Sequence, residues 1–260
     1  MKITSTLYLL LLTLFLHGCS IFPKEQDETK GWSAQKFYTE AKKALNTGDY
    51  ENAIRYYELL DSRYPFGRYA SQGQIDTAYA YYKFDEPESA IAAADRFIKL
   101  HPNHPHVDYA YYLKGLIYFN RNIGILARIF QQQGASRDPA SARQAFIEFS
   151  TLVKKYPKSR YAHDALLRAR YLRNNLGMHE IHVAQYYMRR GAYVAVVNRC
   201  KYVIENFDRS IAVPDALDLM AQAYDKLGLK KLAIDARRVL TASYPDAVSH
   251  KAKKSWWNPF

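Results

Sequence analysis

A small residue recurs at one register along the chain, and this recurrence constrains the fold more than any other feature. Its positions are Ala53, Ala90, Ala145, Val196 and Ala233, with spacings of 37, 55, 51 and 37 residues. The apolar residues around these positions follow a helical period, and no alternating strand pattern of any length competes with them. Small side chains allow two helices to approach closely. The pattern therefore predicts an all-α chain of about five stacked helix-turn-helix units.

The first unit contains Gly48-Asp49-Tyr50-Glu51-Asn52-Ala53-Ile54, followed by two tyrosines and Pro65. It resembles the tetratricopeptide repeat, with Gly at the turn, a small residue opening helix B, an aromatic residue one turn later and a closing Pro. The turn position recurs at Asp85, Gly191 and Gly228, and the closing position at Pro102, Pro157, Asp208 and Pro245. The resemblance implies a superhelix with a concave face lined by the first helix of each unit.

The two long spacings require extra residues. We expect an insertion over 121–139 and an additional helix over 159–176, between the third and fourth units. The repeat domain is predicted over 32–246, and a basic and aromatic tail follows over 247–260.

The first residues are typical of an exported chain. A positive Lys2 precedes the apolar run Leu7–Leu16, which is too short to span a bilayer and matches the core of a signal peptide over 1–18. Leu16-His17-Gly18-Cys19 resembles the lipobox of bacterial lipoproteins, although a chance Cys after an ordinary secretory signal is the alternative. The resemblance implies a diacylglycerol on the Cys19 thiol and an acyl chain on its freed amine, and several chains together make a stable anchor. Ser20, by the sorting rule of such lipoproteins, implies the outer membrane of a Gram-negative cell, with 19–31 as a polar tether.

The composition argues for a binding scaffold. The net charge of +12 comes from Lys and Arg spread along the chain, which favours a solvated repeat surface, although a basic balance also suits anionic partners. No nucleic-acid-binding pattern is found, so no nucleic acid is expected. If Cys19 is acylated, Cys200 is the remaining thiol and no internal disulfide forms; we expect Cys200 to be a packing residue. No catalytic grouping or phosphate loop stands out, so neither an enzyme nor a cofactor is expected beyond the lipid on Cys19.

Several segments together are similar to one family. They are Tyr64-Pro65-Phe66-Gly67, Ala80-Tyr81-Tyr82-Lys83, Asp95-Arg96-Phe97-Ile98, His101-Pro102-Asn103-His104-Pro105, Arg137-Asp138-Pro139, and the run from Arg190 to Arg199. They resemble the BamD family, lipoproteins of the outer-membrane β-barrel assembly machinery, and the likeness covers roughly residues 16–246. It implies binding to the periplasmic POTRA region of BamA, to unfolded β-barrel precursors and to other lipoproteins of the complex, on the periplasmic face of the outer membrane. A different periplasmic repeat lipoprotein, related to the cell wall or to DNA uptake, is the alternative.

Aromatic residues on the first helices of units one to three form the first candidate site. They are Tyr38, Tyr79, Tyr82, Tyr109, Tyr112 and Phe119. We interpret them as a groove for an extended, aromatic-rich client segment; the alternative is that the rings only pack between helices.

Arg190 and Arg199 form the second candidate site. The family resemblance places them where BamA binds, and Arg suits bidentate pairing with carboxylates. The alternative is that both are solvated.

Two further segments have open interpretations. His101, His104 and His106 lie in a Pro-rich loop, which suits a rigid repeat junction better than a metal site. The tail has basic residues beside Trp256 and Trp257, which is typical of a membrane-interface or partner-binding segment, or else of a disordered end.

Overall fold

The computed structural model describes residues 27–122 and 139–247. Helix is the regular secondary structure throughout these two ranges, and neither contains a strand. Cys19, residues 123–138 of the expected insertion and residues 248–260 of the tail lie outside the described residues.

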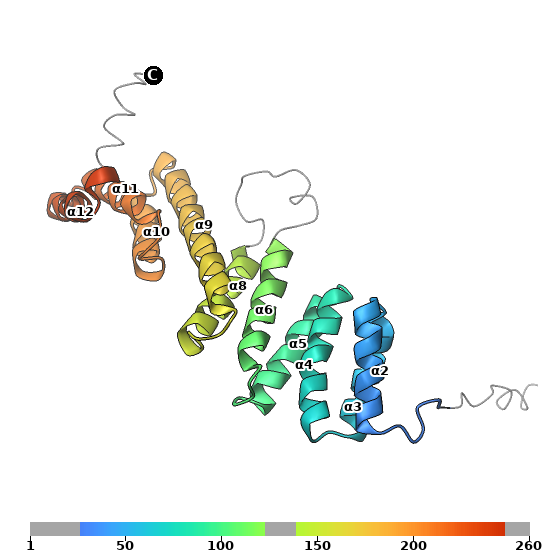
Figure 1. Cartoon of the computed structure of the whole chain (residues 1–260). Helices are drawn as coiled ribbons and strands as arrows, with labels where there is room; N and C mark the ends of the chain where they lie inside the picture. Colours follow the sequence, from blue (N-terminus) through green and yellow to red (C-terminus); the bar gives the residue numbers. More distant parts are fainter. Residues whose placement is uncertain (1–26, 123–138, 248–260) are drawn as a thin grey trace, which may run out of the picture.

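Within the two described ranges, ten helices form five consecutive pairs (Figure 1). The first helices, called helix A, are α2 (Ala34–Thr47), α4 (Arg68–Lys83), α6 (Val107–Asn122), α9 (Ala162–Arg189) and α11 (Val213–Lys226). The second, called helix B, are α3 (Tyr50–Arg63), α5 (Pro87–Leu100), α8 (Pro139–Lys155), α10 (Tyr193–Asn206) and α12 (Lys230–Ser243). The prediction of an all-α chain with five repeat units is confirmed.

Each helix packs mainly on its neighbours in sequence, which produces a twisted row of pairs (Figure 1). Helices A of adjacent pairs also touch: α2 contacts α4, α4 contacts α6, and α9 contacts α11. Because the A helices are the ones that approach each other across the pairs, they line the inner, concave side of the superhelix.

The recurring small residues lie where helices A and B meet. Ala53, Ala90, Ala145, Val196 and Ala233 are all 0% exposed. An aromatic residue follows each of them by eleven positions, at Tyr64, His101, Tyr156, Phe207 and Tyr244. Eleven residues are about three helical turns, so each aromatic residue ends helix B on the face that carries the small residue. Its backbone N–H still donates to the carbonyl four residues earlier, and the chain then leaves the helix.

The turns between helices A and B have the predicted backbone. Gly48, Gly191 and Gly228 have φ of 83°, 71° and 75°. Asp85 occupies the same place in the second unit with φ 64°, and it is the one non-glycine with positive φ among the described residues. Glycine adopts this conformation without steric cost, and Asp tolerates it better than most side chains.

The fourth unit differs from the expected arrangement. The residues over 159–176 are not a separate additional helix, because from Ala162 they belong to α9, which runs unbroken for 28 residues. No proline interrupts this stretch, and Gly177 lies inside the helix where an added Cβ would be 2.9 Å from Ser210 Oγ. The extra length therefore extends helix A of the fourth pair.

Gly115 in α6 makes the closest packing contact of the helical glycines. An added Cβ there would lie 2.5 Å from Phe149 Cε1, and Phe149 is fully buried. We expect Gly115→Ala to lower the free energy of unfolding by about 1–3 kcal/mol, because the ring must shift within a packed core. Urea unfolding followed by circular dichroism measures this effect.

Gly73→Ala in α4 is the matched control. Its added Cβ meets the end of the Leu60 side chain at 3.0 Å, and both variants gain the same helix propensity. A loss at Gly115 no larger than that at Gly73 would contradict the packing argument.

Candidate functional site

The six groove aromatics lie on α2, α4 and α6, the A helices of the first three pairs. Each of them is half-buried. The rings pack against each other and against neighbouring helices: Tyr79 lies 6.4 Å from Tyr82, and Tyr112 stacks on Tyr161 at 4.8 Å between centroids. The structure therefore brings the predicted residues to one side of the superhelix, where they pack between helices and also keep part of their surface exposed.

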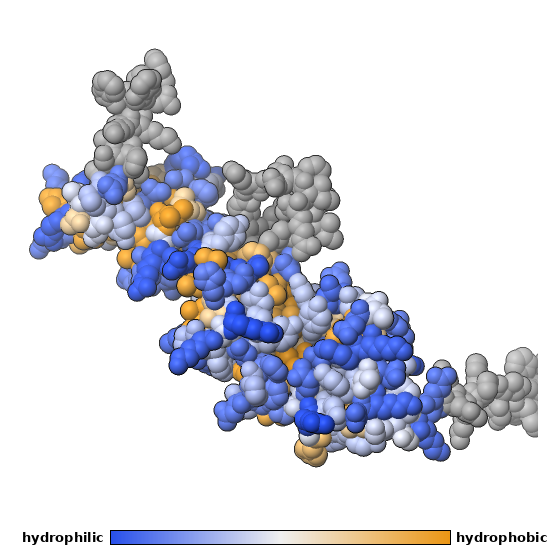
Figure 2. Space-filling model, in the orientation of Figure 1, coloured by the Kyte–Doolittle hydropathy of each residue, from blue (hydrophilic) through white to orange (hydrophobic). Residues whose placement is uncertain are grey.

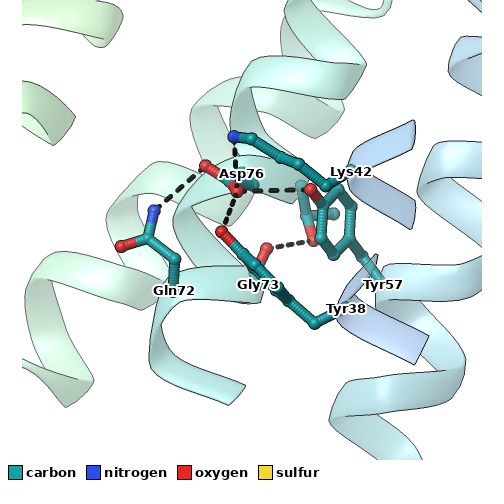
Figure 3. A network of polar contacts seen from close by, with 7 residues as sticks. Tyr38, Lys42, Tyr57, Gln72, Gly73 and Asp76 are labelled. Carbon is teal, nitrogen blue, oxygen red and sulfur yellow. Dashed lines mark hydrogen bonds and ion pairs between the residues drawn. The ribbon is translucent and has the colours of Figure 1, made fainter. Parts of the chain in front are cut away.

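The buried carboxylate of Asp76 organises the first part of this side (Figure 3). Asp76 lies on α4 and is 7% exposed. Its Oδ2 accepts from the Tyr38 hydroxyl at 3.2 Å, the Tyr57 hydroxyl at 3.2 Å and Lys42 Nζ at 3.0 Å. Its Oδ1 accepts from Gln72 Nε2 at 3.1 Å. The carboxylate of Asp76 thus joins helices α2, α3 and α4.

This carboxylate also fixes the protonation of the two tyrosines. Burial raises the pKa of Tyr38 and of Tyr57, and the negative charge of Asp76 raises both further. Both hydroxyls therefore remain donors to Asp76, and the ring of Tyr38 is the part of that side chain left for other contacts. That ring lies 5.5 Å from Tyr69 and 6.1 Å from Tyr57.

A second polar centre holds the aromatics of α6. The Tyr112 hydroxyl donates to Asp164 Oδ2 at 2.7 Å, and Arg168 Nε donates to the same oxygen at 2.6 Å. Burial and the bond to Asp164 raise the pKa of Tyr112 to about 12. The Arg168 guanidinium also lies over the Phe119 ring at 5.0 Å. Tyr112 and Phe119 are therefore positioned by α9, the next A helix.

Arg199, from the second candidate site, forms an internal ion pair. Its Nη1 lies 3.0 Å from Oε2 of Glu180, whose side chain is 7% exposed, while the Arg199 side chain is 45% exposed. Arg143 Nη2 approaches the other Glu180 oxygen at 3.9 Å. Beside the pair is a hollow of about 290 Å³ lined by Tyr187, Ala195, Asn198, Arg199 and Tyr202. Arg199 is therefore neither simply solvated nor free, because it connects α10 to a buried carboxylate of α9.

Arg190 has a different environment. It is exposed at the end of α9, and its guanidinium lies 5.1 Å from the Tyr186 ring centroid. Arg190 and Arg199 are on opposite sides of the turn between α9 and α10.

Cys200, next to Arg199 in sequence, is fully buried, as its predicted packing role requires. Burial raises the pKa of its thiol to about 12.

The three histidines stack around the turn between α5 and α6. The His101 and His104 rings are 5.3 and 5.2 Å from Phe97, and His101 Nε2 is 2.8 Å from Gln74 Oε1. Burial and the two neighbouring imidazoles lower the pKa of His104. No group of three or more metal-ligating side chains is arranged for a metal ion in the part of the chain that the structure describes. The loop has the geometry of a packed repeat junction.

The residues missed from the sequence are the acidic partners Asp76, Asp164 and Glu180. Asp76 and Glu180 each lie inside an apolar helix face, where an unpaired carboxylate would be costly. An acidic residue in such a position was the available signal, but its partners come from other helices and no local pattern indicates them.

The comparisons with known proteins decide the family. A family model described as outer membrane lipoprotein matches residues 31–240. The chain is 43% identical over 239 residues to the outer membrane protein assembly factor BamD of Neisseria meningitidis, covering 90% of each chain. The chain belongs to the BamD family of outer membrane lipoproteins.

More distant BamD proteins match over similar lengths. The BamD of Vibrio cholerae is 36% identical, with 86% of this chain and 92% of the relative covered. That of Xylella fastidiosa is 34% identical, with 93% and 82% covered. The BamD likeness thus includes both candidate sites. Among the described residues, no helix is long and apolar enough to cross a membrane.

The Asp76 network predicts a stability effect. Asp76→Asn removes the charge that pairs with Lys42 and replaces one accepting oxygen by an amide. We expect a loss of about 1–3 kcal/mol in the free energy of unfolding, because buried donors lose their acceptor. Chemical unfolding of both proteins measures this loss.

Asp85→Asn serves as the control, since Asp85 is exposed in a turn whose positive φ suits Asn. Equal stability of Asp76→Asn and Asp85→Asn would show that the network contributes nothing.

Proposed function

We propose that this chain is an assembly factor for outer membrane proteins. A lipid on Cys19 anchors it to the periplasmic face of the outer membrane. Its superhelix binds the POTRA region of BamA and unfolded β-barrel precursors, beside other lipoproteins of the complex. The observation that carries the proposal is 43% identity to a named assembly factor over 90% of both chains.

The concave side suits an extended client segment. Its aromatics are half-buried, and the hydroxyls of Tyr38 and Tyr112 are already engaged by carboxylates. What these side chains offer is therefore ring surface, which packs on the aromatic and aliphatic side chains of a strand. Because Asp76 and Asp164 hold the rings in place, little side-chain entropy is lost when a client binds.

A photocrosslinking probe tests the groove. We expect a probe at Tyr79 to capture a peptide that mimics the C-terminal strand of a barrel protein, because this ring lies on an A helix beside Tyr82 and its hydroxyl is not among those bonded to Asp76 or Asp164. A probe at Leu100, 52% exposed at the end of helix B of the second pair, serves as the control. Capture is read from the mass of the crosslinked product.

Equal labelling at positions 79 and 100 would mean that the peptide binds non-specifically. If probes at all six aromatic positions capture no peptide while the circular dichroism signal of the helices is unchanged, the groove is not the client-binding site.

Arg199 suits the proposed BamA contact because more than a third of its side chain is exposed while one face is held by Glu180. A partner carboxylate would meet a pre-positioned guanidinium beside the hollow formed with Asn198 and Tyr202. The same geometry argues against Arg199→Glu as a test. That change would place a carboxylate against buried Glu180 and destabilise the fold.

Arg199→Gln and Glu180→Gln together separate binding from folding. Both remove the ion pair, so both lower stability, by about 1–3 kcal/mol. Only Arg199→Gln removes the guanidinium. We therefore expect Arg199→Gln to weaken BamA binding at least about tenfold, and Glu180→Gln to weaken it far less.

Calorimetric titration with the BamA POTRA region, below the unfolding temperature of each variant, gives the two affinities. If both variants bind BamA equally, Arg199 acts through the fold and not through contact.

A further inference from the structure

Phe66 is the most exposed large apolar side chain in the described part of the protein, at 91%. It lies in the short connection between α3 and α4, where Tyr64, two residues earlier, is 38% exposed and donates its hydroxyl to the Trp32 carbonyl at 2.8 Å. Figure 2 shows an apolar lobe projecting from the lower edge of the molecule, which is otherwise mostly hydrophilic there. Phe66 therefore contributes almost nothing to the core, and nearly all of its ring surface is available for contact with another molecule.

The N-terminal segment is fastened to the same edge. Arg63, the last residue of α3, donates through Nη1 to the Thr29 carbonyl at 2.9 Å and through Nη2 to Asp27 Oδ2 at 2.5 Å. Thr29 is 5% exposed. Residues 27–33 then enter α2 at the rim that also carries the α3–α4 connection (Figure 1). Arg63 precedes Phe66 by three residues and bonds both Asp27 and Thr29. The chain toward Cys19 therefore leaves the fold close to the α3–α4 connection.

The length of chain beyond this point limits the distance to a lipid anchor. Asp27 is eight positions along the chain from Cys19, and eight extended residues span at most about 26–29 Å. With Cys19 lipidated, the rim cannot move further than this from the bilayer surface.

The charges on this edge favour phospholipid headgroups. Arg68 follows Phe66 by two residues and is exposed, with its guanidinium over the Tyr69 ring at 4.8 Å. Lys30 is also exposed, in the N-terminal segment that Arg63 holds. Glu28 is the exposed carboxylate of the same segment, whereas Asp27 is neutralised by Arg63. An exposed aromatic ring with flanking cations is the composition of segments that lie in the membrane interface.

We propose that the α3–α4 connection is a second membrane contact, in which Phe66 enters the headgroup region of the bilayer that holds the Cys19 lipid. Lys30 and Arg68 bind lipid phosphates on either side. This contact rests on the proposed lipid anchor. It sets the orientation of the superhelix, because two points of attachment stop the domain from swinging on its tether.

An environment-sensitive fluorophore tests the contact in the full-length lipidated protein. Phe66→Cys, in a Cys200→Ala background, is labelled with bimane and reconstituted into phosphatidylethanolamine and phosphatidylglycerol vesicles. Asn46→Cys is the matched control, because Asn46 is exposed in the last turn of α2, at the opposite edge. We expect shallow doxyl lipids to quench position 66 at least about twofold more than position 46, and aqueous iodide to quench it less, since interfacial side chains lie about 5–10 Å into the headgroup boundary.

Vesicle flotation and mass spectrometry of the N-terminus report the anchor separately. Floating, acylated protein with equal iodide access at positions 66 and 46 would overturn the membrane contact and leave the anchor intact. Shielding from iodide without lipid quenching would also overturn it, in favour of a protein contact at Phe66. Protein with an unmodified N-terminus that does not float would remove the anchor and the membrane contact together.

Discussion

The close approach of helices A and B, at one small residue in each pair, is the constraint on which the rest of the structure depends. Ala53, Ala90, Ala145, Val196 and Ala233 are all fully buried. A larger side chain at any of them would separate the pair and misplace the next one, because neighbouring pairs share their packing surfaces. The aromatic residue eleven positions later, which begins the exit from helix B, repeats this register at the end of every unit.

Charged groups add specificity to this apolar framework. Asp76, Glu148 and Glu180 are nearly buried carboxylates, and each pairs with a cation from a different helix: Lys42, Lys114 and Arg199 respectively. Burial alone would lower the pKa of Lys114, but hydrogen bonds to Asp95 and Glu148 and their negative charges raise it, so the Lys114 ammonium keeps its charge. Such pairs add little net stability, yet a shifted helix would leave a buried charge unpaired. They therefore penalise incorrect registers between neighbouring helices, and two of them also organise the candidate sites.

The sequence predicted the repeats because each repeat is encoded locally. Each signal lies within a single unit: the small residue, the turn residue such as Asp85, and the closing proline. All of them occupy the expected places. The continuity of α9 was not predicted, because helical periodicity does not distinguish two consecutive helices from one when no proline or turn separates them. The groove aromatics were assigned correctly to the A helices, but their hydroxyl partners were missed. Asp76 is 38 residues from Tyr38 and Asp164 is 52 residues from Tyr112, so only the assembled superhelix brings them together.

The length of α9 has a mechanical consequence. Its 28 residues span about 42 Å, and its two halves belong to different cores: Leu172 packs with α8, and Ile181 packs with α10 and α11. A continuous helix resists bending, so a movement of one core is passed on to the other. A small shift imposed where Arg190 and Arg199 lie would therefore be passed along α9 to Asp164 and Arg168 near its opposite end. Through these two side chains the movement would reach Tyr112 and Phe119, so α9 links the two candidate sites.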